Sequence, residues 1–160
     1  MPRLAFPRLA FQESTPSSEH NVRPRRPGKA DLHTMQSILI ADGDERVAQM
    51  FAEVFAGHDW HVTAYSDGRR AGEDLRGGAH YDAVLVGYLF EGVDGVDLIK
   101  QIRALDHRQD VPIVMLTGIV EVTVMAAALT AGADDVLYKP IDAAILVATV
   151  NTCVARRRKA

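Results

Sequence analysis

Short apolar runs alternate with amphipathic helical segments from residue 35 to the end of this 160-residue chain. Five of the apolar runs are expected to form strands, at 37–41, 60–65, 81–86, 112–116 and 136–138. Helices are expected to follow them at 44–57, 67–75, 93–105, 120–131 and 142–157. Five βα units in series predict an α/β fold with a doubly wound, five-stranded parallel sheet covered by helices on both faces. Right-handed crossovers restrict its topology, and the expected strand order is 2-1-3-4-5.

Residues 1–34 differ in composition from the rest of the chain. They hold five of the seven prolines and several arginines, without apolar periodicity after Phe11. We therefore expect a disordered Pro/Arg-rich leader at 1–34 and one compact domain at 35–160. The unit PRLAF occurs at 2–6 and again at 7–11. A docking motif and a chance product of the chosen reading frame are both open interpretations of this repeat.

Charge and cysteine content narrow the classes of function. The leader has a net charge of +3 and residues 35–160 have −6, so the domain lacks the basic face expected of a nucleic-acid-binding protein. Cys153 is the only cysteine, which excludes an internal disulfide framework and favours a reducing, cytoplasmic compartment. No apolar run approaches 18 residues and no secretion signal opens the chain, so no membrane association is expected.

Ligands of a doubly wound sheet bind beyond the carboxyl ends of its strands. In this chain the expected strands end at Asp42-Gly43-Asp44, Gly87, Thr117 and Lys139. Two of these positions are glycines, so any site there lacks side chains where two strands end.

The stretches ILIADGDERV, AGHDWHVTAYSDG, YDAVLVGYLFEGVDGVDLIKQIRALD, VPIVMLTG and AGADDVLYKP occur in this order. With this order and spacing, residues 36–154 resemble a response-regulator receiver domain of the chemotaxis type. The resemblance implies a flavodoxin-like (βα)5 fold and a role in bacterial two-component signalling. In that family a histidine kinase transfers a phosphoryl group to an aspartate after the third strand, with Mg²⁺ held partly by an acidic pair after the first.

The resemblance assigns roles residue by residue, and only part of the family's site is present. Asp42 matches the first acid, Thr117 the phosphate-contacting hydroxyl, and Lys139 with Pro140 the Lys-Pro pair, whose peptide bond is usually cis in this family. Gly43 takes the place of the second acid and Gly87 that of the phosphoacceptor. Glu91 replaces the usual loop proline, and Val136 replaces a switching aromatic residue.

Glycine offers no carboxylate, so the sequence predicts a degenerate receiver that lacks the phosphoacceptor, with no catalytic residue, no metal site and no cofactor. Lys139, without an acid at 87, could pair with Asp42. Restoring both acids, at Gly43 and Gly87, is expected to recover Mg²⁺ binding. Three other acids are candidates to replace the missing one. Asp82 lies near the start of its strand, Glu91 lies in the following loop, and Asp44 can cap a helix.

The helix at 121–131 carries a single charge, Glu121. Met125 and Leu129 are expected to face the sheet, which leaves an uncharged outer face typical of protein contact, made by Thr123, Val124, Ala127 and Thr130. The resemblance points to the same surface, formed with the next strand and the last helix, as the usual output and dimerisation face.

The favoured function is a stand-alone, non-phosphorylatable interaction module that is not an enzyme and that binds a kinase, a regulator or a second copy of itself. One alternative is a regulatory module that holds a small anion or nucleotide in the vacated pocket or at the basic tail, 156–159. The other alternative is a phosphoacceptor with an unconventional acid.

Overall fold

The computed structural model describes residues 35–159. The predicted leader, 1–34, lies outside the described residues. The strands are β1 (Ser37–Ala41), β2 (His61–Tyr65), β3 (Ala83–Gly87), β4 (Ile113–Thr117) and β5 (Asp135–Tyr138). The helices are α1 (Glu45–Ala56), α2 (Gly68–Arg76), α3 (Gly95–Arg103), α4 (Val122–Ala131) and α5 (Ala143–Lys159), with a short 3-10 turn at Asp106–Arg108.

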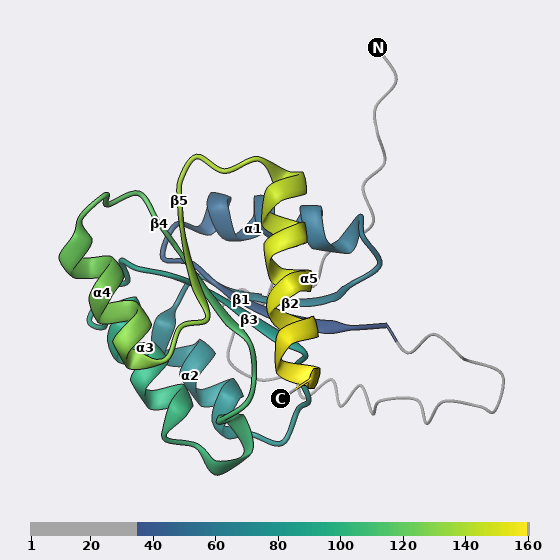
Figure 1. Cartoon of the computed structure of the whole chain (residues 1–160), viewed down its shortest axis with the longest axis horizontal. Coiled ribbons are helices and arrows are strands. Elements are labelled where there is room, and N and C mark those ends of the chain that lie inside the picture. The colour runs from purple at the N-terminus through teal and green to yellow at the C-terminus, as the bar shows by residue number, and fades with distance from the viewer. Residues whose placement is uncertain (1–34, 160) are drawn as a thin grey trace, which may run out of the picture.

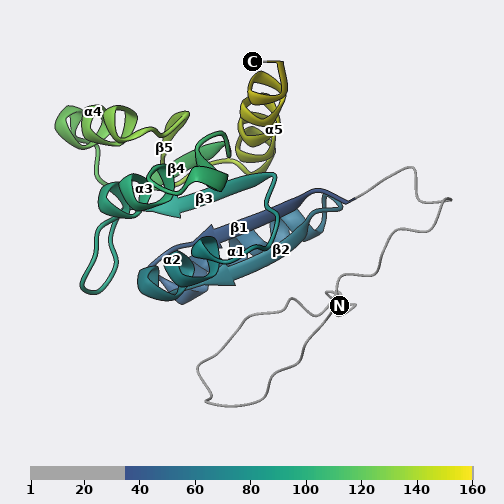
Figure 2. The same cartoon turned by 90° about the horizontal axis from the view of Figure 1, so that it is seen from below.

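The strands form one parallel sheet in the order β2-β1-β3-β4-β5, which confirms the predicted fold (Figure 1). α1 and α5 cover one face, and α2, α3 and α4 cover the other, as Figure 2 shows from a second direction. Each face has its own core. Phe55 and Leu146 are fully buried on the α1–α5 side, and Leu75 and Ile99 are fully buried on the other side.

Aspartates fix where four of the five helices begin, and Asp142 caps α5 through the amides of Ala144 and Ile145. Asp44, Asp67 and Asp94 each accept hydrogen bonds from backbone amides of the first helical turn, which satisfies donors that have no partner inside the helix. For this reason α3 begins at Gly95 rather than at the predicted Val93. Gly95 also has to be glycine, because a Cβ there would overlap the carbonyl oxygen of Gly87.

The prediction for α4 is confirmed for Met125, which is partly buried against the core on the sheet side of this helix, and is wrong for Leu129. The residue buried against the sheet is Ala128, whereas Leu129, predicted to face the sheet, is 45% exposed. Consecutive helical residues are rotated by about 100°, so a shift of one position moves a side chain off the core face. The prediction followed the larger side chain, but the sheet at this place leaves room for alanine.

Candidate functional site

The residues predicted to form the site gather at the carboxyl edge of the sheet. Asp42 follows β1, Gly87 ends β3, Thr117 ends β4 and Lys139 follows β5. Asp42 is buried, and one of its carboxylate oxygens, Oδ2, accepts a hydrogen bond from Lys139 Nζ at 2.5 Å. The other, Oδ1, accepts the backbone amide of Asp44 at 3.0 Å. The ion pair anticipated from the sequence is therefore present, and both oxygens of Asp42 are engaged.

The space beside Gly87 is filled by Asp42. A Cβ added at Gly87 would lie 2.9 Å from Asp42 Oδ2 and 3.0 Å from its Cγ. Both separations are shorter than ordinary carbon contacts, so a side chain at 87 requires the Asp42 carboxylate to move. The space beside Gly87, which the resemblance assigns to a phosphoacceptor, is thus occupied by the carboxylate that follows the neighbouring strand and is paired with Lys139.

Gly43, which the resemblance assigns to the second acid, has no room for a side chain because the backbone of another loop lies against it. A Cβ added at Gly43 would overlap the carbonyl oxygen of Leu89, in the loop between β3 and α3. The expectation that acids at 43 and 87 would restore a metal site therefore requires correction. The β3–α3 loop and the Asp42 carboxylate would both have to be displaced before the two new side chains could fit.

Hydrogen bonds of Thr117 and a cis peptide bond before Pro140 shape the backbone at the carboxyl edge of the sheet. The Thr117 hydroxyl oxygen accepts the backbone amide of Ile119 at 3.0 Å, and the Thr117 carbonyl accepts the amide of Lys139 at 2.9 Å. The Lys139–Pro140 peptide bond is cis, as the resemblance implied. These contacts tie the β4–α4 loop and the end of β5 together, and they place Lys139 against Asp42.

None of the substitute acids considered in the sequence lies against Gly87. Asp44 caps α1 through the amides of Arg46 and Val47. Asp82 precedes β3, at the opposite edge of the sheet, where it accepts the amide of Ser37. Glu91 is exposed in the β3–α3 loop.

Mg²⁺ requires several hard oxygen ligands, and the residues at this edge do not fit that need. Gly43 and Gly87 offer no carboxylate, and both oxygens of Asp42 already have partners. Among residues 35–159, no group of three or more His, Cys, Asp or Glu side chains could hold a metal ion. The edge is a closed, charge-paired contact between strands.

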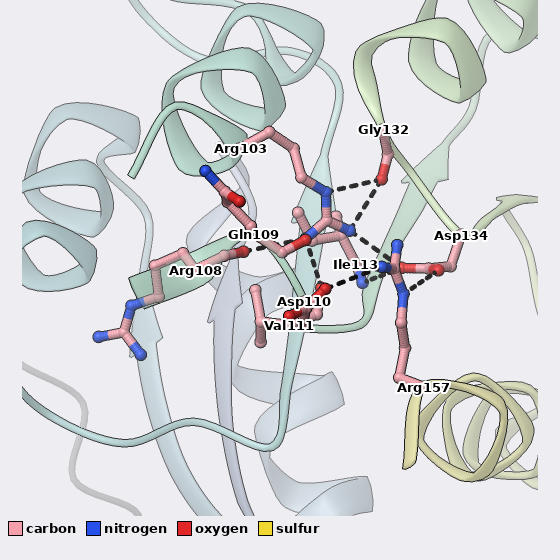
Figure 3. Close-up of polar contacts among 9 residues, drawn as sticks. All are labelled: Arg103, Arg108, Gln109, Asp110, Val111, Ile113, Gly132, Asp134 and Arg157. Atoms are coloured by element: carbon pink, nitrogen blue, oxygen red, sulfur yellow. Dashed lines mark hydrogen bonds and ion pairs between the residues drawn. The ribbon is translucent and has the colours of Figure 1, made fainter. Parts of the chain in front are cut away.

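A second polar cluster lies at the opposite edge of the sheet, and the sequence reading missed it. Arg103, at the end of α3, donates to the carbonyl oxygens of Gly132, Arg108, Gln109 and Val111 and to the Asp134 carboxylate (Figure 3). Burial lowers the pKa of Arg103, and the nearby Arg157 adds to this effect while Asp134 opposes it.

Asp134 joins this cluster to the last helix. Its Oδ1 accepts from Arg157 Nε at 2.7 Å, and its Oδ2 accepts the amide of Ile113 at 2.8 Å. The cluster therefore connects α3, α4, α5 and the start of β4, a structural role that no local sequence pattern indicates.

The four predicted contact residues of α4 differ in how exposed they are. Thr123, Ala127 and Thr130 are exposed and Val124 is partly buried. Ala127 and Thr130 line a hollow of about 620 Å³ between α3 and α4, together with Val96 and Lys100. Leu129 is half-exposed and does not line that hollow, because helical geometry turns its side chain to the other side of α4.

The carboxyl edge of this sheet, with an acid after β1, a hydroxyl after β4 and a cis Lys-Pro after β5, defines the receiver class of signalling domain. The family model of the response regulator receiver domain matches residues 38–151. The chain belongs to this family.

Relatives of known name agree with this assignment. The chain is 33% identical over 121 residues to the DNA-binding response regulator MtrA of Mycobacterium leprae, which covers 76% of this chain and 52% of the relative. It is also 33% identical over 123 residues to the sensory transduction protein RegX3 of Mycobacterium bovis, with the same coverage of each chain. The chain thus spans about half the length of the curated relatives it matches.

A solved structure of a two-component response regulator from Clostridium difficile superposes with a TM-score of 0.71 at 28% identity, covering 79% of this chain and 100% of that one. The receiver domain of Francisella response regulator 1452 gives a TM-score of 0.68 at 26% identity, covering 76% of this chain and 98% of that one.

Within residues 35–159, no helix has the length and apolar character needed to cross a membrane.

Proposed function

We propose that this chain is a receiver that does not accept a phosphoryl group and that signals by binding another protein. The observation that carries the proposal is the Asp42 carboxylate, paired with Lys139 in the space where the phosphoacceptor side chain would stand. The domain at 35–160 acts as the binding module.

Chemistry at the closed edge supports the absence of phosphoryl transfer. A carboxylate nucleophile has to reach the phosphorus in line with the leaving group, and a metal has to neutralise the phosphoryl oxygens. Gly87 supplies no nucleophile. Lys139, the cation that would contact the transferred group, is bound to Asp42 instead.

The same ion pair replaces the signal that phosphate would give. In a working receiver the lysine after β5 contacts the phosphoryl group. In this chain Lys139 is paired with Asp42, the residue that follows β1. We therefore expect one signalling state, controlled by the amount of protein or by its partner. The alternative of a small anion in the vacated pocket has lost its basis, because a carboxylate fills that space.

The surface formed by α4, β5 and α5 is the proposed binding face, for a homodimer, a kinase or another regulator. It exposes Val122 and Leu129 on α4 and Ile145 on α5. Large apolar side chains on adjacent elements are typical of a contact surface. Apolar area contributes roughly 25 cal/mol per Å² before the costs of association, so these three exposed side chains suit one specific partner rather than a large permanent assembly.

Incubation with acetyl phosphate and Mg²⁺, followed by intact mass measurement, tests the proposal. The full chain is expected to keep its mass. A stoichiometric gain of one phosphoryl group would overturn the proposal, and its loss in Glu91→Gln or Asp42→Asn would identify the acceptor.

A further inference from the structure

Arg108, in the 3-10 turn between α3 and β4, is a buried arginine whose side chain is directed away from the cluster around Arg103 (Figure 3). Its Nε donates to the carbonyl oxygen of Leu75 at 3.0 Å, and its Nη2 donates to those of Gly77 and Ala79. These carbonyls lie at the end of α2 and just beyond it, where the negative pole of the helix dipole favours a cation. Arg108 therefore caps this end of α2.

Arg103 and Arg108 differ in their charge partners. Arg103 pairs with the carboxylate of Asp134. Arg108 forms no ion pair within the part of the chain that the structure describes. Burial lowers the pKa of Arg108, and Tyr81 and Asp74 oppose this effect, although the Asp74 carboxylate itself accepts the hydroxyl of Tyr81. A buried charge is costly unless it is paired, so the Arg108 guanidinium can still gain a counterion.

One nitrogen of the Arg108 guanidinium has no acceptor. Nε, Nη1 and Nη2 of Arg103 all donate hydrogen bonds, whereas Nη1 of Arg108 donates to no group among the described residues. Every buried side-chain nitrogen or oxygen of these residues has a partner, so Nη1 has to reach solvent. Arg108 is only 4% exposed and lines a hollow of about 300 Å³. Its free N–H groups therefore open into this hollow.

The hollow lies at the edge of the sheet opposite Asp42 and Lys139, between the segments that precede β3 and β4 and the last turns of α5. Most charged side chains of its lining contact one another, as His80 with Asp82, Arg158 with Asp82, and Arg157 with Asp110. Asp106, also in the lining, is exposed. Arg108 is thus the arginine of this hollow that has no carboxylate partner among the described residues.

The Arg108 guanidinium is fixed in place before any ligand arrives. Backbone carbonyls hold Nε and Nη2, and the guanidinium lies over the ring of Tyr81, with Cζ 5.3 Å from the ring centroid. The backbone carbonyl of Arg108 accepts Arg103 Nη1 at 3.1 Å. A donor that is already ordered loses little conformational entropy on binding. Guanidinium N–H groups favour the oxygens of carboxylates and phosphates.

We propose that this hollow binds the oxyanion group of a small ligand, a phosphate or a carboxylate, with Arg108 Nη1 as its donor and countercharge. A volume of about 300 Å³ is at the lower end for small-molecule sites, so it suits a compact ligand. The site lies beside the basic tail, away from the edge that Asp42 and Lys139 close. Binding there requires neither the loss of phosphate acceptance nor a protein partner, so it stands apart from the proposed function.

Titration of the full chain with inorganic phosphate, at constant ionic strength, tests this site. The side-chain Nε–H NMR signal of Arg108 and the amide signals of Tyr81 and Asp110 are expected to shift saturably at millimolar phosphate. The Nε–H signal of Arg103 is the matched internal control and is expected to stay in place, because its donors are already engaged. A parallel titration with acetate identifies the ligand class, since the anion that binds more tightly marks it as a phosphate or a carboxylate.

Charge variants make the test specific to the hollow. Asp106→Asn removes a carboxylate from the lining and is expected to tighten phosphate binding at least about twofold. Glu73→Gln, which alters an exposed acid of α2 outside the hollow, is expected to leave the affinity unchanged. Arg108→Met is expected to abolish the saturable shifts. If that variant does not fold, the titration of the unaltered chain and the comparison of Asp106→Asn with Glu73→Gln still decide.

Three results would contradict an oxyanion site at Arg108. The Arg108 signal could stay in place at millimolar concentrations of both anions, or the Arg103 signal could shift as much as that of Arg108. Equal changes of affinity in Asp106→Asn and Glu73→Gln would show that the anion responds to the overall charge of the protein and not to this hollow.

Discussion

The Asp42 carboxylate has a different partner for each oxygen, a lysine ammonium from β5 and a backbone amide of its own loop. A buried charge is tolerated only when it is paired and hydrogen-bonded, and Asp42 meets both conditions without a metal. At the scale of single residues, both carboxylate oxygens of Asp42 therefore already have a hydrogen-bond partner within the protein.

Removal of the Lys139 side chain is expected to lower the free energy of unfolding, because the buried Asp42 carboxylate then lacks its cation. Lys139→Met leaves the Asp42 carboxylate buried without its cation, and we expect a loss of roughly 3 kcal/mol in the free energy of unfolding, measured in urea. Lys100→Met removes an exposed pair with Asp97 and is expected to cost at most about 0.5 kcal/mol. Equal effects of the two substitutions would show that the Asp42–Lys139 pair is unimportant for the fold.

Restoring the acceptor side chain alone is expected to harm the fold. Gly87→Asp forces a second carboxylate against Asp42, and overpacking of this kind costs roughly 1–3 kcal/mol. Gly78→Asp is the matched control, because a Cβ there meets nothing within 4 Å. Adding Asp42→Ala to Gly87→Asp is expected to recover part of the loss, since one carboxylate then remains for Lys139. Additive effects in this double-mutant cycle would contradict direct contact between positions 42 and 87.

Among the elements, α3, α4 and α5 are connected through one partly buried arginine, Arg103. Arg103 donates hydrogen bonds to carbonyl oxygens of the turn before β4 and of the α4–β5 connection. Asp134 extends the cluster to α5, because it accepts a hydrogen bond from Arg157 (Figure 3). A guanidinium offers five donors in a fixed plane, which a lysine cannot imitate.

Arg103→Met is expected to lower the free energy of unfolding by roughly 3 kcal/mol, because buried carbonyl oxygens and Asp134 lose their donors. Arg103→Lys is expected to recover only a minor part of the loss. Arg76→Met, on the exposed last turn of α2, is the control and is expected to change stability by less than about 0.5 kcal/mol. Thermal or urea unfolding that failed to separate Arg103 from Arg76 would contradict the structural role of the cluster.

The elements themselves could be predicted from the sequence, because apolar runs and aspartate caps are local signals. The five strands and five helices occur in the predicted order, with bounds that differ by a few residues. The register of α4 could not be predicted, since its alanines and threonines give little periodic contrast. Arg103 was missed because its partners come from the chain 5 to 31 residues away.

The candidate site was predicted in part. The resemblance to the family indicated which roles Gly43 and Gly87 would have to fill. The absence of an acid at 87 then predicted that Lys139 pairs with Asp42, and the structure contains this pair. That Leu89 closes over Gly43 could not be read from the sequence, because a backbone oxygen leaves no residue-type signal. The same closure is why we no longer expect two acids to recreate a metal site.

On the scale of the whole molecule, the two exposed sides of α4 are predicted to behave differently. Leu129→Glu places a charge on the proposed α4–β5–α5 face, and we expect association to weaken by about 2–3 kcal/mol, roughly a hundredfold in Kd. Ala127→Glu lies in the hollow beside α3 and is expected to leave association unchanged. Light scattering gives the mass of each variant, and circular dichroism checks the fold. Dissociation by Ala127→Glu alone would move the interface to the α3 side.

The central claim is that the Asp42–Lys139 pair closes the site against both metal and phosphate. A Mg²⁺ titration of the isotope-labelled full chain, followed through the amide NMR signals of Asp42, Gly43, Gly87 and Lys139, tests this most directly. The ion would have to displace Lys139 from Asp42 without any carboxylate from 43 or 87 to assist it. We predict that these four signals stay in place up to millimolar Mg²⁺. Saturable shifts confined to them would show that the edge still binds metal, and would contradict the account.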